Sequence, residues 1–280
     1  MRLALALTII IAVSSAGQPA DSLAAASAAY DRKDYASCGE LYRRLAEHSP
    51  VGLRNQYLYN AIGCFALAGT TDDAFRALDD LIAGGYVNTK SLREEPDFDS
   101  LRADKRWEAV FARAQANWAK KFGADNRELW ALREADEDDR QPGADSKAGA
   151  KRDRARLTRV KQIVAEGGLK TANDYFMAAM LFQHGSQPED YQQARTLALR
   201  ATQLDPTNTR ATWLAAAAQD RYLWSIGKPQ MYGTQFHEVN GVWTIEPIDD
   251  TVTDDERAKW HVPPLADARR RAESMNAKAQ

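Results

Sequence analysis

The chain has 280 residues, a formal charge of −2, 44% hydrophobic residues and 27% charged residues. These values exclude a disordered chain, and the length is enough for two ordinary domains with cores of their own. No nucleic acid partner is expected, because the basic run from Lys147 to Lys161 is offset by the acidic run from Glu134 to Asp139, as on paired solvated helix faces.

The first sixteen residues have the composition of a signal peptide. Arg2 precedes an apolar run from Leu3 to Val13, and Ser14 and Ala16 occupy the minus-three and minus-one positions of a cleavage site. We therefore expect cleavage near Ala16 and a periplasmic or secreted protein. The apolar run is too short to span a bilayer comfortably and no second run follows, so no integral membrane segment is expected after signal removal.

Between residues 20 and 118, apolar and small residues recur at helical spacing in two-helix units. The units run from Ser22 to Pro50 and from Leu58 to Gly85. The residues that carry the repetition are Ala25, Ala26, Ala29, Tyr35, Cys38, Tyr42, Leu45 and Pro50 in the first unit, and Ala61, Phe65, Gly69, Ala74, Leu78 and Leu81 in the second.

This pattern of small residues at close crossings, an aromatic residue early in the second helix and a terminal proline resembles the tetratricopeptide repeat. The second unit departs from it, with Thr71 in place of the aromatic residue and Gly84–Gly85 in place of the proline. A degenerate third unit, Tyr86 to Trp118, is expected to cap the stack. The resemblance implies helical hairpins that bind a protein or peptide partner.

The chain contains two cysteines, Cys38 and Cys64. In the repeat register they fall on neighbouring helices, so the resemblance implies that they lie close together. An even pair in an oxidising compartment tends to be joined by a disulfide. The alternative is that both are small buried hydrophobic residues with free thiols.

A second domain is expected over residues 124–280. Helical spacing, caps and breakers predict helices over 127–140, 150–166, 171–184, 188–206, a segment through 212–221 that ends near 224, 254–260 and 265–275. Asn240–Gly241 favours a tight turn, which predicts a small β-hairpin within 234–247. The predicted fold class is therefore mainly α, with tetratricopeptide-like helical hairpins followed by an α-helical domain with one small β-hairpin.

The stretch from Asp220 to Gln235 is dense in hydrogen-bonding side chains. Asp220 and Arg221 close an apolar run, and Gly227, Pro229 and Gly233 prevent a regular helix after it. Polar residues on a constrained loop often form a site. The candidate binding residues are Gln183, Gln230, Tyr232, Thr234 and Gln235. The alternative is a tightly packed structural turn.

These residues carry a second resemblance, to a family of bacterial exported domains of unknown function. The matching positions, in order, are Gln183–His184, Asp220–Arg221, Gly227, Gln230, Tyr232–Gln235 and Pro263–Pro264–Leu265. The segment from Glu134 to Arg140 matches the family's acidic opening only loosely, because Asp136 lacks the usual following glutamine. The resemblance implies a domain identity and no activity.

The catalytic candidates are His184, Asp220 and Arg221. His184 would act as a general base oriented by Asp220, and Arg221 or the loop amides near Gly233 would hold an anion. The alternative is a histidine that caps its own helix and is bonded to a buried carboxylate.

No serine elbow, catalytic cysteine or phosphate loop is present in the sequence. His184, His237 and His261 fit no zinc-binding spacing, so neither a metal site nor a cofactor is predicted.

Two classes of function follow. The first is an exported binding module whose repeats dock a protein or peptide in the cell envelope. The alternative is an envelope hydrolase or transferase with its site at His184, Asp220–Arg221 and Gln230–Gln235. The sequence leaves open whether the protein is an enzyme.

Overall fold

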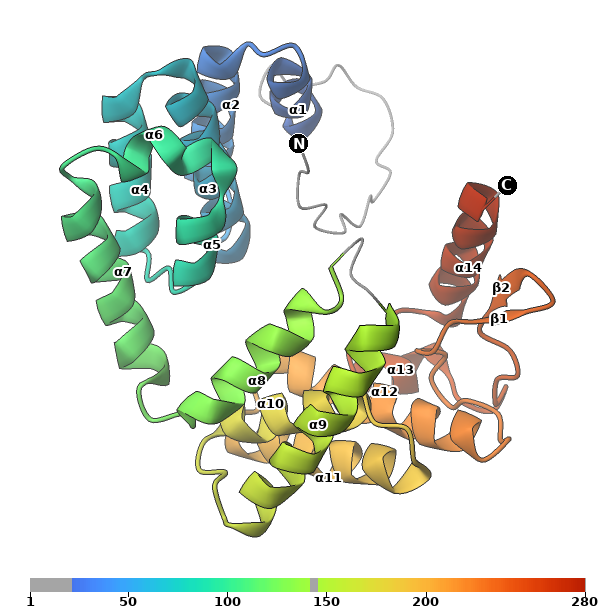
Figure 1. The fold of residues 1–280 in the computed structure, drawn as a ribbon. Coiled ribbons are helices and arrows are strands. Elements are labelled where there is room, and N and C mark those ends of the chain that lie inside the picture. The colour runs from blue at the N-terminus through green and yellow to red at the C-terminus, as the bar shows by residue number, and fades with distance from the viewer. Residues whose placement is uncertain (1–21, 142–145, 280) are drawn as a thin grey trace. The chain divides into compact units, whose positions relative to one another are not determined.

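The computed structural model describes residues 22–141 and 146–279 (Figure 1). The predicted signal peptide, residues 1–16, lies outside the described residues. The chain divides into two compact units, Met1–Gly123 and Ala124–Gln280. The predicted fold class is confirmed, because the secondary structure is helical apart from one two-stranded antiparallel sheet in the described part of the chain.

In unit 1 the helices α1 to α4 pack each on the next, and α7 packs on α4 and α5. Its elements are α1 (Leu23–Asp31), α2 (Tyr35–Glu47), α3 (Val51–Ala68), α4 (Thr71–Ala83), α5 (Thr89–Glu94), the 3₁₀ turn η1 (Pro96–Phe98), α6 (Asp99–Arg102) and α7 (Trp107–Phe122).

Short-range signals set the helix ends of unit 1. The side chain of Ser22 accepts a hydrogen bond from the Ala25 amide at the start of α1, and that of Asp34 accepts one from the Ser37 amide at the start of α2. Gly69 ends α3 in the left-handed conformation, with φ of 74°. The predicted second unit began at Leu58, whereas α3 begins at Val51, because Pro50 has the extended backbone of an N-cap and starts the next helix.

The core of unit 1 lies between α2, α3 and α4 and is closed by η1 and α6. Its largest fully buried side chains include Phe65, Leu78 and Phe98. Cys38 on α2 and Cys64 on α3 are both buried and are joined by a disulfide. The bond therefore ties together the second helix of the first hairpin and the first helix of the second.

Helices α2 and α3 are in tight contact at Gly39. A Cβ atom added to this glycine would lie 2.4 Å from Cε1 of Phe65, which is far inside van der Waals contact. The absence of a side chain at Gly39 thus lets the Phe65 ring lie against the backbone of α2. Gly39 was not among the residues that the sequence analysis singled out.

Unit 2 contains α8 (Arg127–Asp138), α9 (Ser146–Ala165), α10 (Ala172–Gln183), α11 (Pro188–Leu204), α12 (Thr209–Ser225), β1 (His237–Val239), β2 (Val242–Thr244), α13 (Asp254–Lys259) and α14 (Leu265–Ala279). Predicted helix boundaries differ from the observed ones by up to four residues, the most where α9 begins at Ser146 rather than Ala150 and where α14 continues beyond Met275 to Ala279. Alanine and charged residues sustain both helices through these positions.

Helices α10, α11 and α12 pack on one another, and α8 and α9 contact α10. The start of α8 is also attached to the start of α10. Asn126 caps α8 by accepting from the Glu128 and Leu129 amides, while its own amide donates to Asp174. Asp174 in turn forms a capping box with Thr171 at the start of α10. One carboxylate thus fixes where both helices begin.

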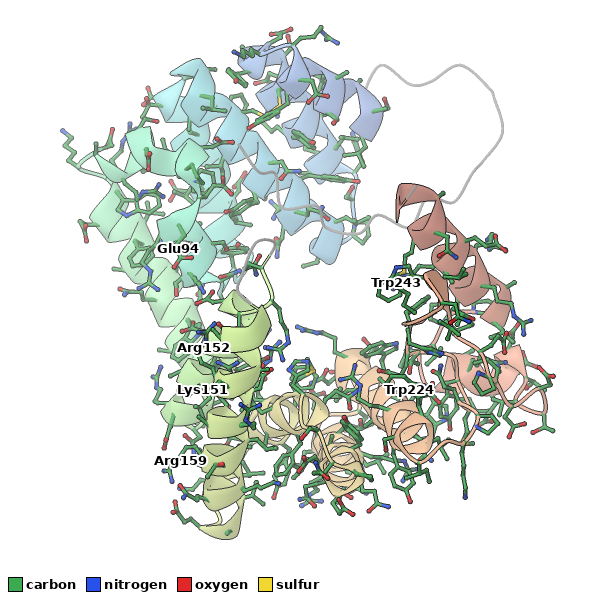
Figure 2. The ribbon with its side chains drawn as sticks, turned by 45° about the vertical axis from the view of Figure 1, so that its right-hand side comes forward. Glu94, Lys151, Arg152, Arg159, Trp224 and Trp243 are labelled. Carbon is green, nitrogen blue, oxygen red and sulfur yellow. A yellow bond between two sulfur atoms is a disulfide. The ribbon has the colours of Figure 1, made fainter. Side chains whose placement is uncertain are left out.

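The predicted β-hairpin is present but short. His237 pairs with Thr244 and Val239 with Val242, and the turn between them has positive φ at Asn240 and Gly241. Trp243, labelled in Figure 2, donates its amide to the Asn276 side chain and accepts a hydrogen bond from it, which attaches β2 to α14. None of the helices in the described ranges combines the length and the apolar composition needed to cross a membrane.

The contact between Gly39 and Phe65 gives a test of unit 1. We expect Gly39→Ala to destabilise the protein by roughly 1–3 kcal/mol, because the added methyl group must displace the buried ring. The matched control is Gly52→Ala in α3, where nothing lies within 4 Å of the added Cβ, and it should leave stability unchanged or raise it by up to about 1 kcal/mol. Equal effects of the two substitutions in urea unfolding would contradict the packing described.

Candidate functional site

The polar stretch after α12 is organised by the carboxylate of Asp220, which is fully buried. Its Oδ1 accepts hydrogen bonds from the amides of Met231 and Tyr232 at 2.8 and 3.0 Å. Its Oδ2 accepts from the amide and the hydroxyl of Thr234 at 2.9 and 2.8 Å. Four donors from one loop therefore bind one carboxylate. These hydrogen bonds replace those to water that the carboxylate loses on burial.

Gln230 holds the other side of the loop. Its side-chain amide donates to the carbonyls of Gln235 and Ile245, and its Oε1 accepts from the Gln235 amide. Its backbone bonds to Pro247 and Asp249. Every polar group of this buried residue is satisfied within the fold, so Gln230 joins the loop to the segment that follows the hairpin.

Several predicted binding residues are therefore internal to the fold. Gln230 is 0% exposed and Tyr232 5% exposed, and the ring of Tyr232 packs against Trp260 with ring centroids 5.6 Å apart. The hydroxyl of Thr234 is bonded to Asp220. The amides predicted to hold an anion near Gly233 are already bonded to the Asp220 carboxylate, so that part of the prediction is wrong.

Burial raises the pKa of the Asp220 carboxyl above its ordinary value, although the hydrogen bonds from Thr234, Tyr232 and Met231 act in the opposite direction.

Arg221 brings three parts of the predicted site together. Its Nε donates to Oε1 of Gln235 at 2.8 Å, and its Nη1 donates to the carbonyl oxygen of Gln183 at 2.6 Å. Its guanidinium carbon lies 6.0 Å from the centroid of the Tyr191 ring. Arg221, on α12, therefore links the end of α10 to the loop that contains Gln235.

Gln183 and Gln235 share one acceptor. Both side-chain amides donate to the carbonyl oxygen of Ala217, at 3.3 and 3.2 Å. Oε1 of Gln183 is buried without a hydrogen-bond partner among the described residues. Since the orphaned atom is an acceptor, the group that would satisfy it is a donor.

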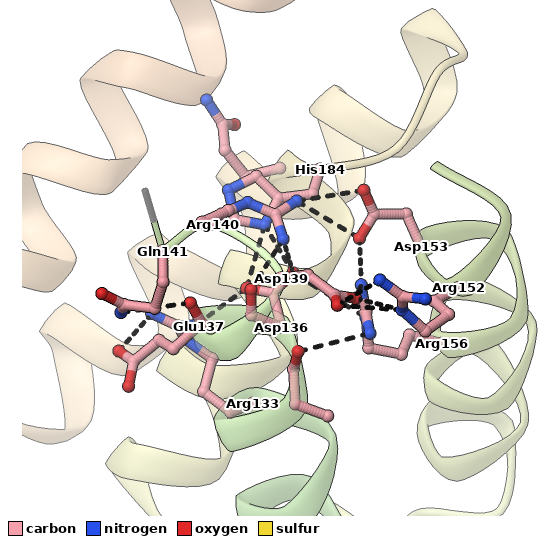
Figure 3. Close-up of polar contacts among 12 residues, drawn as sticks. Arg133, Asp136, Glu137, Asp139, Arg140, Gln141, Arg152, Asp153, Arg156 and His184 are labelled. Carbon is pink, nitrogen blue, oxygen red and sulfur yellow. Dashed lines mark hydrogen bonds and ion pairs between the residues drawn. The ribbon is translucent and has the colours of Figure 1, made fainter. Parts of the chain in front are cut away.

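His184 is oriented by Asp136, and the prediction that Asp220 orients it is wrong. Nδ1 of His184 lies 2.9 Å from Oδ1 and 3.1 Å from Oδ2 of Asp136 on α8 (Figure 3). The ring follows α10 and is partly exposed, at 17% of its side-chain surface. The alternative reading, a histidine bonded to a buried carboxylate, is therefore correct for Nδ1.

Asp136 is the centre of a charge network that joins α8, α9 and α10. Its carboxylate is fully buried and pairs with Arg133 at 2.7 Å and Arg140 at 2.6 Å, with Arg156 at 3.9 Å. The outer layer of the network pairs Arg140 and Arg156 with Asp153, and Arg152 and Arg156 with Asp139 (Figure 3).

This network keeps Asp136 ionised and His184 neutral. Burial acts to raise the pKa of Asp136, but the hydrogen bond from His184 and the charges of Arg140 and Arg133 outweigh it and lower the pKa. Burial, with the charges of Arg140 and Arg221, lowers the pKa of His184 although Asp136 opposes this. Nδ1–H of the neutral ring then donates to Asp136, which leaves Nε2 as an acceptor.

The sequence reasoning missed Asp136 as a functional residue. A signal was available: Asp136 lies three residues after Arg133 and four before Arg140, which places both arginines on its side of the helix. The same segment carried the loose match to the acidic opening of the exported-domain family.

The other histidines of unit 2 lie elsewhere. The ring of His237 stacks on Trp224 at the end of α12, with centroids 5.0 Å apart. His261 lies after α13 with positive φ. Within residues 22–141 and 146–279, no group of three or more histidine, cysteine or carboxylate side chains is arranged to hold a metal ion.

Comparison with protein-family models, with curated proteins and with solved structures gives no match for this chain. The site is therefore interpreted from its own geometry. Figure 3 shows its charged part, in which Arg140 and His184 are partly exposed and contact the buried Asp136.

The role of Asp220 can be tested by Asp220→Asn, which keeps the shape but places an NH₂ group against loop donors. We expect a loss of roughly 2–4 kcal/mol in urea unfolding, since at least one donor loses its acceptor inside the fold. The control Asp267→Asn removes an exposed carboxylate on α14 and should cost less than about 0.5 kcal/mol. Similar losses for both would show that Asp220 does not organise the loop.

The environment of His184 gives a pH dependence. Because its pKa is lower in the folded state, the unfolded chain binds this proton first as the pH falls below about 6.5, so acidification favours unfolding. One such proton contributes at most about 1.4 kcal/mol per pH unit.

His184→Asn keeps a donor toward Asp136 and removes the titration, so it should flatten the fall in urea-unfolding free energy between pH 7 and 5. The control His48→Asn, at an exposed position in unit 1, should keep the wild-type slope. A slope unchanged by His184→Asn would refute this assignment.

Proposed function

We propose that the protein is an exported helical-repeat protein whose residues 20–118 form a tetratricopeptide-like module that binds a protein or peptide partner in the cell envelope. The order of helices in unit 1 supports this, since α1 packs with α2, α3 packs with α4, and the two hairpins meet through α2 and α3. Stacked hairpins of this kind expose a continuous surface for an extended or helical segment.

The observation that carries the proposal is a shallow hollow, largely open to solvent, along one face of α2. It is lined by Ala36, Ser37, Glu40, Leu41 and Arg44. The lining combines apolar side chains with one acidic and one basic residue within two turns of helix. It therefore suits a short segment that presents an apolar residue next to charged ones.

The disulfide is consistent with this location. Disulfides persist in oxidising compartments, and the Cys38–Cys64 bond lies in the unit to which the proposal assigns the binding surface. Export through an N-terminal signal peptide, cleaved near Ala16, is part of the proposal.

A second candidate function, an envelope hydrolase or transferase, is supported by the pairing of Asp136 with His184. A carboxylate that fixes Nδ1–H of a partly exposed histidine leaves Nε2 as a base. In the described residues the hydrogen bonds of this imidazole go to Asp136 alone. The arrangement therefore supports activation of water or of a substrate group rather than of a side-chain nucleophile.

We also infer that unit 2 belongs with the exported domains that its motifs resemble. The motif positions are far apart in sequence, yet Gln183, Arg221 and Gln235 are joined by direct hydrogen bonds. Asp220 and Thr234 are joined in the same way. Contact between the members of a motif is what a shared domain would require.

The binding surface can be tested with Ser37→Arg, which adds a long cation at an exposed position in the hollow. A photocrosslinking residue at position 37 first identifies the envelope protein or peptide bound there. The affinity of the protein for this partner should then fall at least tenfold for Ser37→Arg, because the added side chain fills the hollow.

The matched control Ser100→Arg adds the same charge at an exposed site of unit 1 outside the hollow and should change affinity by less than twofold. No crosslinked partner, or equal affinities for the two variants, would reject α2 as the binding surface.

A further inference from the structure

Arg221 is a half-buried cation whose charge is not balanced by a carboxylate among the described residues. Its two hydrogen bonds go to uncharged acceptors, the Gln183 carbonyl and the Gln235 side chain, and its third contact is the ring of Tyr191. Burial and the charge of Arg140 lower its pKa. An arginine placed in this way costs free energy that an ion pair would normally offset.

The nearby carboxylates are committed to other groups. Asp220 is the next residue in the chain, but its two oxygens accept from the loop donors of residues 231, 232 and 234. Asp136 is held by Arg133, Arg140 and His184, and Asp153 by Arg140 and Arg156. Arg133 also pairs with Glu137, at 2.8 Å, so the network has four carboxylates, Asp136, Glu137, Asp139 and Asp153, for its four arginines and leaves the charge of Arg221 uncompensated.

Two other side chains that are stabilised by a nearby negative charge, His184 and Arg140, lie near Arg221. Its Nη1 is bonded to the carbonyl of Gln183, and His184 is the next residue. Arg140 is paired through its side chain yet remains 36% exposed. The charges of Arg140 and Arg221 both act on the imidazole of His184. Arg140, just after α8, and His184 contact the same Oδ1 of Asp136, at 2.6 and 2.9 Å, and Arg221 on α12 is bonded to the residue before His184, so the three side chains lie close together.

We propose that Arg221 and His184, with Arg140 beside them, form a binding site for a small oxyanion, a carboxylate or a phosphate group. Nη2 of Arg221 has no hydrogen-bond partner within the described ranges, so the guanidinium has a donor to offer. Arginine recognises both kinds of anion through its planar arrangement of donors.

His184 makes binding of the anion dependent on pH. The charged groups that face its ring are Asp136 on α8, Arg140 just after α8 and Arg221 on α12. Nδ1–H is held by Asp136, so a second proton would be carried by Nε2. A bound anion favours that protonated form, and by linkage affinity for the anion rises as the pH falls.

This inference goes beyond the partner proposed for unit 1 and does not depend on it. It shares His184 with the hydrolase or transferase alternative, but it concerns only the binding of an anion and does not depend on catalysis. Failure of the anion site would therefore leave the partner-binding proposal untouched.

The test is isothermal titration of the full mature chain with sodium phosphate and, separately, with sodium acetate, each at pH 5.5 and 7.5. Sodium chloride at the same ionic strength is the reference. Binding of either anion above this reference, stronger at pH 5.5, supports the site. A response to phosphate alone or to acetate alone assigns the ligand class. The absence of binding by both anions overturns the proposal.

Variants locate the binding. Arg221→Gln should weaken it about tenfold or more, the effect of losing a charge-assisted hydrogen bond. The matched control Arg200→Gln removes an equal charge from the exposed end of α11 and should leave affinity within twofold. Equal losses for both overturn the proposal.

Arg221→Lys tests the site even if Arg221→Gln fails to fold, because it keeps the charge and removes the guanidinium. It should bind at least threefold more weakly, and wild-type affinity would overturn the role of Arg221.

A second measurement follows the His184 imidazole by NMR in the wild-type protein. Its pKa should rise when the effective anion is present, and no change would overturn the part assigned to His184.

Discussion

The burial of the Asp220 carboxylate is the constraint on which the second half of unit 2 depends. A charged group inside a helical domain requires donors, and those donors come from backbone amides of the loop that follows α12. Once the loop is wrapped around the carboxylate, Gln230 reaches the residues on both sides of the hairpin. The loop has little regular secondary structure, yet it is determined by hydrogen bonds as fully as a helix is.

The same demand explains why His184 and Arg221 are arranged as they are. Since the Asp220 oxygens accept hydrogen bonds from the loop, Asp220 pairs with neither Arg221 nor His184. His184 is hydrogen-bonded to Asp136 instead. Asp136 is surrounded by arginines, and those arginines are shared with Asp139 and Asp153 in a network that spans α8 and α9. With Glu137, which pairs with Arg133, the four arginines of that network have four carboxylates, and the remaining positive charge lies on Arg221.

The sequence predicted the features that depend on neighbouring residues. The tight turn at Asn240–Gly241 and the mainly helical fold follow from local chemistry and periodicity. The members of the polar cluster were also predicted, as motif positions. Their pairing was not, because which carboxylate meets His184 depends on how α8 packs against α10, and nothing in the chain near His184 encodes that contact.

The two units are stabilised by different kinds of interaction. Unit 1 uses aromatic and aliphatic packing, closed by a disulfide between α2 and α3, so its charged side chains remain at the surface. Unit 2 has an alanine-rich core in α12, and alanine buries little apolar area, so buried polar groups carry more of its specificity. Buried charges in such a domain must be balanced. Arg221 has no carboxylate partner among the described residues and lies next to His184, whose ring is held by Asp136. The proposed anion from outside the chain would balance the charge of Arg221.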